Sequence, residues 1–183
     1  MLPHATKTPG TTNYAVTDDF CKIFAEETDR LYLLALLLTG DHARAQECFV
    51  AALHECLRAK TVFGEWAQSW ARRTIVREAI DLIDPRRTSG NPEQLPSGSL
   101  AKEDITTAFS AILALKNFDR FAFVMTVLEK LSDQDCKVLL ECSRQDLVDA
   151  RSRAMRSVSA FLNSSPRPHA MVPGMAPVLA HAS

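Results

Sequence analysis

The residues best suited to chemistry are basic and amide side chains gathered near the end of the chain, after Ser132. They are Arg144, Gln145, Arg151, Arg153 and Arg156. Arginine pairs well with guanine edges and phosphates, and glutamine pairs with adenine, so this set suits contact with a DNA major groove. Two short helices joined by a tight turn would position the set, with the second helix carrying all five side chains. The stretch therefore predicts a helix-turn-helix.

The same predicted helix also carries two acidic residues, Asp146 and Asp149, which repel phosphate. Asp146 suits DNA only as an acceptor from a cytosine amine. Asp149 and Arg153 stand four residues apart and can form an ion pair on one helix face. An amphipathic surface helix with internal ion pairs is therefore an alternative interpretation of this segment.

A second set of candidate residues lies before the middle of the chain and comprises Trp70, Arg72, Arg73 and Arg77. Arg73 and Arg77 are four residues apart and share a helix face. With a tryptophan for base stacking, they would form a phosphate-holding strip for single-stranded DNA. The alternative is that the tryptophans belong to the core, which we expect for Trp66 and leave open for Trp70.

Residue types that could serve an enzyme or a metal site are not arranged for that purpose. The five histidines and five cysteines show no shared ligand spacing, and His54 and Cys56, two apart on a helix, point to different faces. The chain has no glycine-rich phosphate loop and neither a GxSxG nor an HExxH pattern. We therefore expect no catalysis, metal, cofactor or small-molecule substrate.

The composition is that of an ordinary globular protein. The 183 residues are 46% hydrophobic and 23% charged, which allows one or two small domains. Because the formal net charge is −1 and dedicated nucleic-acid binders are often strongly basic, any DNA-binding patch must be local. Cysteines without a CxxC pair favour a reducing compartment. Without a leader-like start or a membrane-length apolar run, we expect a cytoplasmic protein.

Helical periodicity predicts an all-α fold with two small domains joined by a linker rich in proline and glycine. We expect a disordered lead over 1–16, a helical domain over 17–84, a linker over 85–101, a second helical domain over 102–162 and a disordered tail over 163–183. Helices are expected over about 20–39, 42–60, 65–83 and 118–129, with another around 105–115. Gly40 should end one helix, and Asp41 and Ser132 should cap others.

This organisation, together with three sequence segments, resembles the extracytoplasmic-function sigma factors of bacterial RNA polymerase. The segments are LYLLALLLTGDHARAQECFVAAL, WAQSWARRTIVREAIDLI and LEKLSDQDCKVLLECSRQDLVDARSRAMRSV. The resemblance covers roughly 20–162 and identifies the chain as a diverged relative of the sigma-70 superfamily. It implies a first domain that binds polymerase and engages the melted minus-ten promoter element. The second domain would bind the minus-thirty-five element as duplex.

The resemblance also implies a polymerase-facing surface at Gln46, Glu47, Val50 and Leu53. Family members commonly have Gln-Glu-x-Phe after an acidic pair, whereas this chain has Val-Ala-Ala-Leu at 50–53. The turn of the helix-turn-helix usually contains Leu-Gly, and here it is Leu-Glu-Cys-Ser at 140–143. Losing that glycine removes the residue that adopts a left-handed conformation most cheaply.

The partners implied are RNA polymerase core and promoter DNA, with an anti-sigma factor as a further candidate. The alternative function is that of a degenerate sigma-like protein that acts through protein–protein interaction, for example as an anti-sigma decoy, without promoter recognition. The near-neutral charge and the missing Gln-Glu pair favour this alternative.

Overall fold

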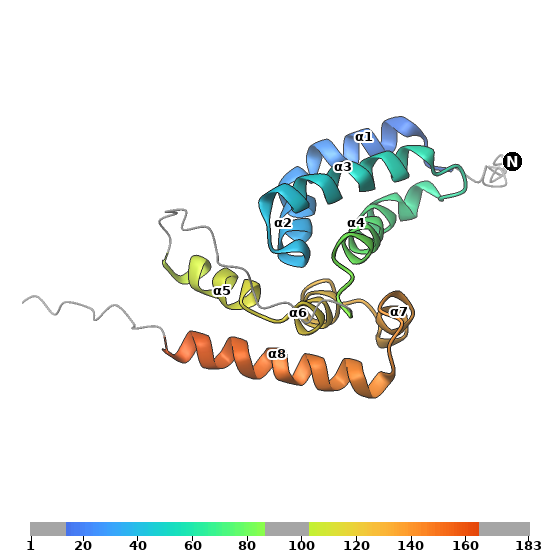
Figure 1. Cartoon of the computed structure of the whole chain (residues 1–183). Coiled ribbons are helices and arrows are strands. Elements are labelled where there is room, and N and C mark those ends of the chain that lie inside the picture. Colours follow the sequence, from blue (N-terminus) through green and yellow to red (C-terminus); the bar gives the residue numbers. More distant parts are fainter. Residues whose placement is uncertain (1–13, 87–102, 165–183) are drawn as a thin grey trace, which may run out of the picture.

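The computed structural model describes residues 14–86 and 103–164, and these residues are mostly helical (Figure 1). Within these ranges there is no strand, and the backbones of Tyr14 and Phe63 form an isolated antiparallel bridge. The predicted all-α class is confirmed. None of the helices in the described ranges has the length and apolar character needed to cross a membrane. Nearly all of the predicted lead, linker and tail lies outside the described residues.

The first helical group contains α1 (Thr17–Glu26), α2 (Thr28–Thr39), α3 (His42–Arg58), the 3-10 turn η1 (Gly64–Trp66) and α4 (Ala67–Ile83). Local sequence explains where α2 ends and α3 begins. Gly40 ends α2 with a φ of 77°, in the left-handed region that favours glycine. The carboxylate of Asp41 accepts a hydrogen bond from the amide of Arg44 at 2.9 Å and so caps α3. Both predicted boundaries are confirmed.

The segment predicted as one helix over 20–39 is instead two helices, α1 and α2, that meet at Glu27. Glu27 leaves the helical conformation, with φ −110° and ψ 20°. The hydroxyl of Thr28 donates to the carbonyl of Ala25 at 3.1 Å, which is the kind of side-chain bond that competes with a continuous helix. The prediction was wrong here because the apolar periodicity continues through the break.

The second helical group contains α5 (Glu103–Leu113), α6 (Asn117–Phe123), the π-helical turn η2 (Val124–Leu128), α7 (Asp133–Leu139) and α8 (Arg144–Ser164). The turn η2 continues α6, and the amide of Glu129 donates to the carbonyl of Val124, five residues back, at 2.9 Å. Ser132 caps α7 as predicted, since its hydroxyl accepts from the amide of Asp135 at 3.0 Å.

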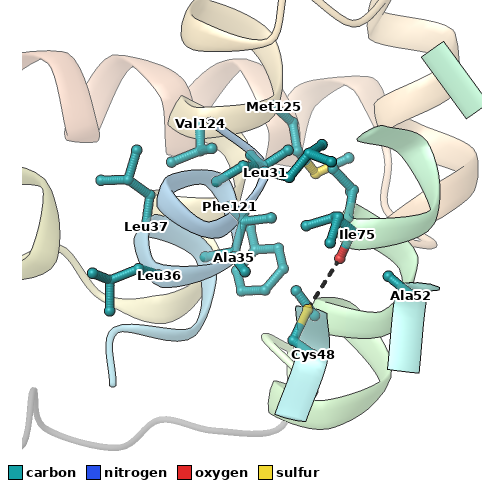
Figure 2. Close-up of a cluster of buried hydrophobic side chains, with 14 of the residues drawn as sticks. Leu31, Ala35, Leu36, Leu37, Cys48, Ala52, Ile75, Phe121, Val124 and Met125 are labelled. Atoms are coloured by element: carbon teal, nitrogen blue, oxygen red, sulfur yellow. Dashed lines mark hydrogen bonds between the residues drawn. The ribbon is translucent and has the colours of Figure 1, made fainter. Parts of the chain in front are cut away.

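One hydrophobic cluster joins the two helical groups. Figure 2 shows Leu31 of α2 and Ile75 of α4 around the same centre as Phe121 of α6 and Met125 of η2. All four side chains are fully buried. Removing apolar surface from water is worth about 25 cal/mol per Å². The packing of α6 and η2 against α2 and α4 therefore holds the two groups together.

Arg120 of α6 adds a polar contact between the groups. Its side chain is 4% exposed, and its Nη2 donates to the carbonyl oxygens of Leu38 at 3.1 Å and Thr39 at 3.4 Å. These acceptors lie in the last turn of α2, where carbonyls have no helical partner and the helix dipole favours positive charge. Gly40 makes the approach possible, because a Cβ there would lie 3.1 Å from the guanidinium nitrogens. Burial lowers the pKa of Arg120 to about 10.

Candidate nucleic-acid interface

The helices α7 and α8 are joined by residues 140–143 and pack against each other. Their inner face consists of Cys136, Leu140, Leu147 and Ala150, each at most 2% exposed. Arg144 and Gln145 lie in the first turn of α8, and both side chains are exposed. The buried face thus fixes the two helices while leaving the beginning of α8 open to solvent.

The turn between the helices contains a residue in the left-handed region that is not glycine. Glu141 has a φ of 48°. After it, Ser143 and Asp146 form reciprocal bonds that begin α8. The carboxylate of Asp146 accepts from the hydroxyl of Ser143 at 2.7 Å, and that hydroxyl accepts from the amide of Asp146 at 3.1 Å. The hydroxyl bond holds the pKa of Asp146 below its ordinary value. Helix capping therefore accounts for an aspartate at position 146, and no contact with a DNA base is needed to explain it.

Two of the α8 arginines proposed as DNA contacts are paired with acids of the same helical group. Arg153 donates through Nη2 and Nε to both carboxylate oxygens of Asp119, at 2.7 and 3.1 Å. This bidentate bond raises the pKa of Arg153. Nη1 of Arg151 lies 3.1 Å from Oδ1 of Asp133. Phosphate binding at either arginine would require exchange with a carboxylate.

The remaining predicted side chains of α8 have other surroundings. Arg144 has no acidic partner within the described ranges, and Arg156 donates to the carbonyl of Ser152 in its own helix at 3.3 Å. Gln145 donates to Asp149 at 2.9 Å. The predicted pair of Asp149 with Arg153 is replaced by the contact of that arginine with α6.

Two arginines of the predicted strip on α4 face acids of the second helical group. Arg72 donates through Nε and Nη2 to the two carboxylate oxygens of Glu129, at 2.8 and 3.1 Å, and its Nη1 lies 3.6 Å from Glu27. The hydrogen bond with Glu129 raises the pKa of Arg72. Nη2 of Arg73 lies 2.8 Å from Oδ1 of Asp135. Both arginines are therefore engaged across the two groups.

The third arginine of the strip is engaged within its own helical group, because Nη2 of Arg77 lies 3.3 Å from the carboxylate of Glu55 on α3. Trp70 is half-buried beside it. Together with Leu139 of α7, these two residues line a hollow of about 100 Å³. The indole Nε1 of Trp70 is buried and has no hydrogen-bond acceptor.

The expectation that Trp66 belongs to the core was wrong. Its side chain is 57% exposed at the end of η1, where its ring meets the edge of Phe63 with centroids 5.2 Å apart. Periodicity misplaced it because the helix expected from residue 65 begins at Ala67, after a 3-10 turn. The sets on α4 and α8 do not merge into one surface, since α6 and α7 lie between these helices (Figure 1).

The predicted polymerase-facing residues lie on α3. Gln46, Glu47 and Val50 are exposed, and Leu53 is partly buried against the hydrophobic cluster. Val50 is 44% exposed, so an apolar side chain stands on the surface between polar ones. These residues form one side of the helix, as their spacing predicts.

In the part of the chain that the structure describes, no three histidine, cysteine or acidic side chains are placed to hold a metal ion. The five cysteines are free thiols. Burial raises the pKa of Cys48 to about 12 and the pKa values of Cys56 and Cys136 to about 11.

Sequence reasoning missed the acidic partners of the arginines. Asp119, Glu129, Asp133 and Asp135 fall within seventeen residues of sequence, and this concentration is the one signal that was present. It does not reveal which arginine each carboxylate meets, because the partners are up to 62 residues away.

Comparison with known proteins does not assign the chain to a family, since no family model, curated protein or solved structure matches it.

Proposed function

We propose that the chain is a diverged, sigma-factor-like transcription initiation protein that binds RNA polymerase core and promoter DNA in the cytoplasm. The observation that carries this proposal is the arrangement of α7, the turn and α8. A buried apolar face supports the pair while Arg144 and Gln145 stand exposed at the beginning of the second helix. Helix-turn-helix proteins present these N-terminal residues to base edges.

In this proposal the helical group over 102–162 binds duplex DNA. Arg144 contacts a base edge and Arg156 contacts the phosphate backbone, and neither has an acidic partner in the described ranges. Arg151 and Arg153 follow by exchanging their carboxylates for phosphates. Affinity then comes largely from counterion release and weakens as the salt concentration rises.

The helical group over 17–84 has two roles in this proposal. The surface of α3 at Gln46, Glu47, Val50 and Leu53 binds the polymerase, with Val50 as the apolar centre of the contact. The strip on α4 holds the melted DNA strand, because arginines bind its phosphates and tryptophan stacks on its bases. In this proposal the chain gives the polymerase its promoter specificity and itself catalyses no reaction.

The test is transcription in vitro with core polymerase from the same organism and the DNA upstream of the chain's own gene. Added protein should produce a defined transcript. In parallel, binding to that duplex is measured as a function of salt for an R144A/R156A variant. Losing one base contact and one phosphate contact should lower the salt slope by about 1 and weaken binding roughly tenfold or more.

The matched control is R30A/R58A, which removes two exposed arginines of the first helical group and changes the net charge equally. It should bind the duplex like the parent. Equal loss in both variants would show that total charge rather than α8 governs binding, and no binding by the parent would contradict the proposal.

A second candidate function is protein–protein interaction without promoter recognition, as in an anti-sigma decoy. The observation that favours it is the pairing of Arg72, Arg73, Arg77, Arg151 and Arg153 with carboxylates of the same chain. A pull-down separates the two candidates. Recovery of core polymerase subunits supports the initiation protein, and recovery of an anti-sigma factor without core subunits supports the decoy.

A further inference from the structure

We propose that the described arrangement is a closed, autoinhibited state in which Glu129 and Asp135 occupy the phosphate-binding groups of α4. Single-stranded DNA then binds this strip only after the two helical groups separate. The inference rests on the proposed function, because it takes Trp70, Arg72 and Arg73 as contacts of the melted strand. It adds that two carboxylates of the same chain, Glu129 and Asp135, compete with DNA phosphates for the arginines of α4.

The first argument is the geometry of the contact between Arg72 and Glu129. Two nitrogens of one guanidinium donate to two oxygens of one carboxylate at 2.8 and 3.1 Å. Arginine binds a phosphate through the same fork of parallel hydrogen bonds. The carboxylate and a DNA phosphate therefore compete for the same donors, and one guanidinium cannot offer this fork to both.

The second argument is where these bridges run. Arg72 and Arg73 stand on α4, whereas Glu129 follows η2 and Asp135 lies on α7, so both bridges join one helical group to the other. The pair of Arg77 with Glu55 stays within the first group. At Arg72 and Arg73, the carboxylate that competes with phosphate also holds the two helical groups together. At Arg77 it does not.

The third argument comes from Trp70. Leu139 of α7 lines the same hollow as this side chain, so α7 stands beside the surface on which a base would stack. The indole N–H is buried without an acceptor, which is an unfavourable situation for a polar group. The closed state therefore contains one unsatisfied donor at the proposed DNA-binding strip.

Closure does not depend on the bridges alone. Phe121 and Met125 are fully buried in the cluster they share with Leu31 and Ile75, and Arg120 binds the end of α2. Partly exposed ion pairs contribute little to stability by comparison. Removing the two carboxylates should therefore raise the open fraction without unfolding either group, and the apparent DNA affinity rises in proportion to that fraction.

The experiment uses the full chain with E129Q/D135N in a W66F background, which leaves Trp70 as the one remaining tryptophan. The probe is a fluorescein-labelled 30-nucleotide single strand of mixed sequence, followed by anisotropy. Quenching of tryptophan emission by acrylamide reports the exposure of the α4 strip. The expected result is about tenfold tighter binding, corresponding to about 1.4 kcal/mol, with increased quenching.

The matched control is D18N/D29N in the same background, which changes the net charge equally at exposed acids of α1 and α2. It should leave both readouts at the parent values. The single variant D135N removes the more exposed bridge alone, and it should give a smaller shift in the same direction. Circular dichroism establishes that each variant is folded.

Equal single-strand affinity in the parent and in the folded E129Q/D135N variant overturns the closed-state proposal. If duplex binding and polymerase recovery persist in that case, the proposed function stands without autoinhibition. If neither protein binds duplex, single strand or polymerase, the proposed function itself fails. If D18N/D29N also binds the single strand ten times more tightly, the effect reflects net charge, and the proposed competition between carboxylates and phosphates is overturned.

Discussion

The guanidinium of Arg120 closes the C-terminal end of a helix that lies 82 residues earlier in the chain, donating from Nη2 to the carbonyl oxygen of Leu38 at 3.1 Å. A buried cation usually meets a carboxylate, but here its acceptors are carbonyls and the amide oxygen of Asn117. The contact ties α6 to α2 at the edge of the shared hydrophobic cluster. It therefore bears directly on how firmly the two groups are joined.

Replacing Arg120 by methionine should destabilise the protein. The carbonyls of Leu38 and Thr39 would lose their donor within the interface, and an unsatisfied buried acceptor costs about 1–3 kcal/mol. Urea unfolding followed by circular dichroism measures this loss. An R30M variant on the exposed side of α2 is the control and should unfold like the parent. Equal stability of R120M and the parent would show that water satisfies those carbonyls.

Replacing Glu141 by glycine should stabilise the protein. The residue holds a φ of 48°, and a left-handed conformation costs a residue with a Cβ about 1–2 kcal/mol. Glycine avoids that cost but gains backbone freedom in the unfolded chain, so we expect a net gain of about 0.5–1 kcal/mol. The shift in urea midpoint measures it. A lower midpoint in E141G would show that the glutamate stabilises the turn by a contact that outweighs its backbone strain.

Arg144 and Arg153 should respond differently to replacement by alanine. Arg144 is exposed without an acidic partner in the described ranges, so R144A should weaken duplex binding with little change in stability, within about 0.5 kcal/mol. R153A leaves the mostly buried carboxylate of Asp119 without its bidentate partner and should lower the thermal midpoint. Calorimetry and anisotropy together measure the contrast. Equal stability losses would contradict it.

Introducing a charge at Val50 should weaken polymerase binding. This side chain is 44% exposed at the centre of the proposed surface on α3, so V50E should fold normally while placing a carboxylate in an apolar contact. We expect at least tenfold weaker binding, which corresponds to about 1.4 kcal/mol, in surface plasmon resonance with immobilised core. The control is L33E, at an exposed apolar residue on α2. Unchanged binding of V50E would place the polymerase surface elsewhere.

The stability of the protein should fall in alkaline solution through its buried thiols. Burial raises the pKa of Cys48 to about 12, whereas a thiol in an unfolded chain ionises near about 8.5. Because the folded pKa is the higher one, this contribution is complete below the unfolded value and is lost as the pH rises toward the folded value. For Cys48 this loss is at most about 1.4 kcal/mol per pH unit between about pH 8.5 and 12.

Urea titrations at neutral and alkaline pH measure this loss, and C48A serves as the control because it removes the titrating group. Its free energy of unfolding should fall less steeply with pH than that of the parent. Parallel pH profiles for the two proteins would show that Cys48 does not titrate differently in the folded and unfolded states.

Local signals in the sequence predicted local structure well. Gly40, Asp41 and Ser132 mark helix ends because each acts on backbone groups within a few residues, and all three do so here. The break at Glu27 and the exposure of Trp66 escaped prediction because apolar spacing continues across both.

The candidate site was predictable only as a set of basic side chains. Spacing identified arginines on common helix faces, but their charge is offset by acids from other helices, such as Glu129 for Arg72 and Asp119 for Arg153. Such pairs depend on how helices pack, and helical periodicity carries no information about that. The role of Arg120 escaped prediction for the same reason, since its acceptors belong to α2.

The π-helical turn η2 sets the rotational positions of Leu128 and of Glu129, which follows it. It contains one residue more than an α-helical turn would, and each residue of an α-helix turns the chain by about 100°. With this extra residue, Leu128 is 42% exposed and Glu129 meets Arg72. A regular helix over the same residues would bring Leu128 toward the arginine and turn the carboxylate away. The one extra residue of the π-helical turn thus determines whether a carboxylate or a leucine side chain faces Arg72 between the two helical groups.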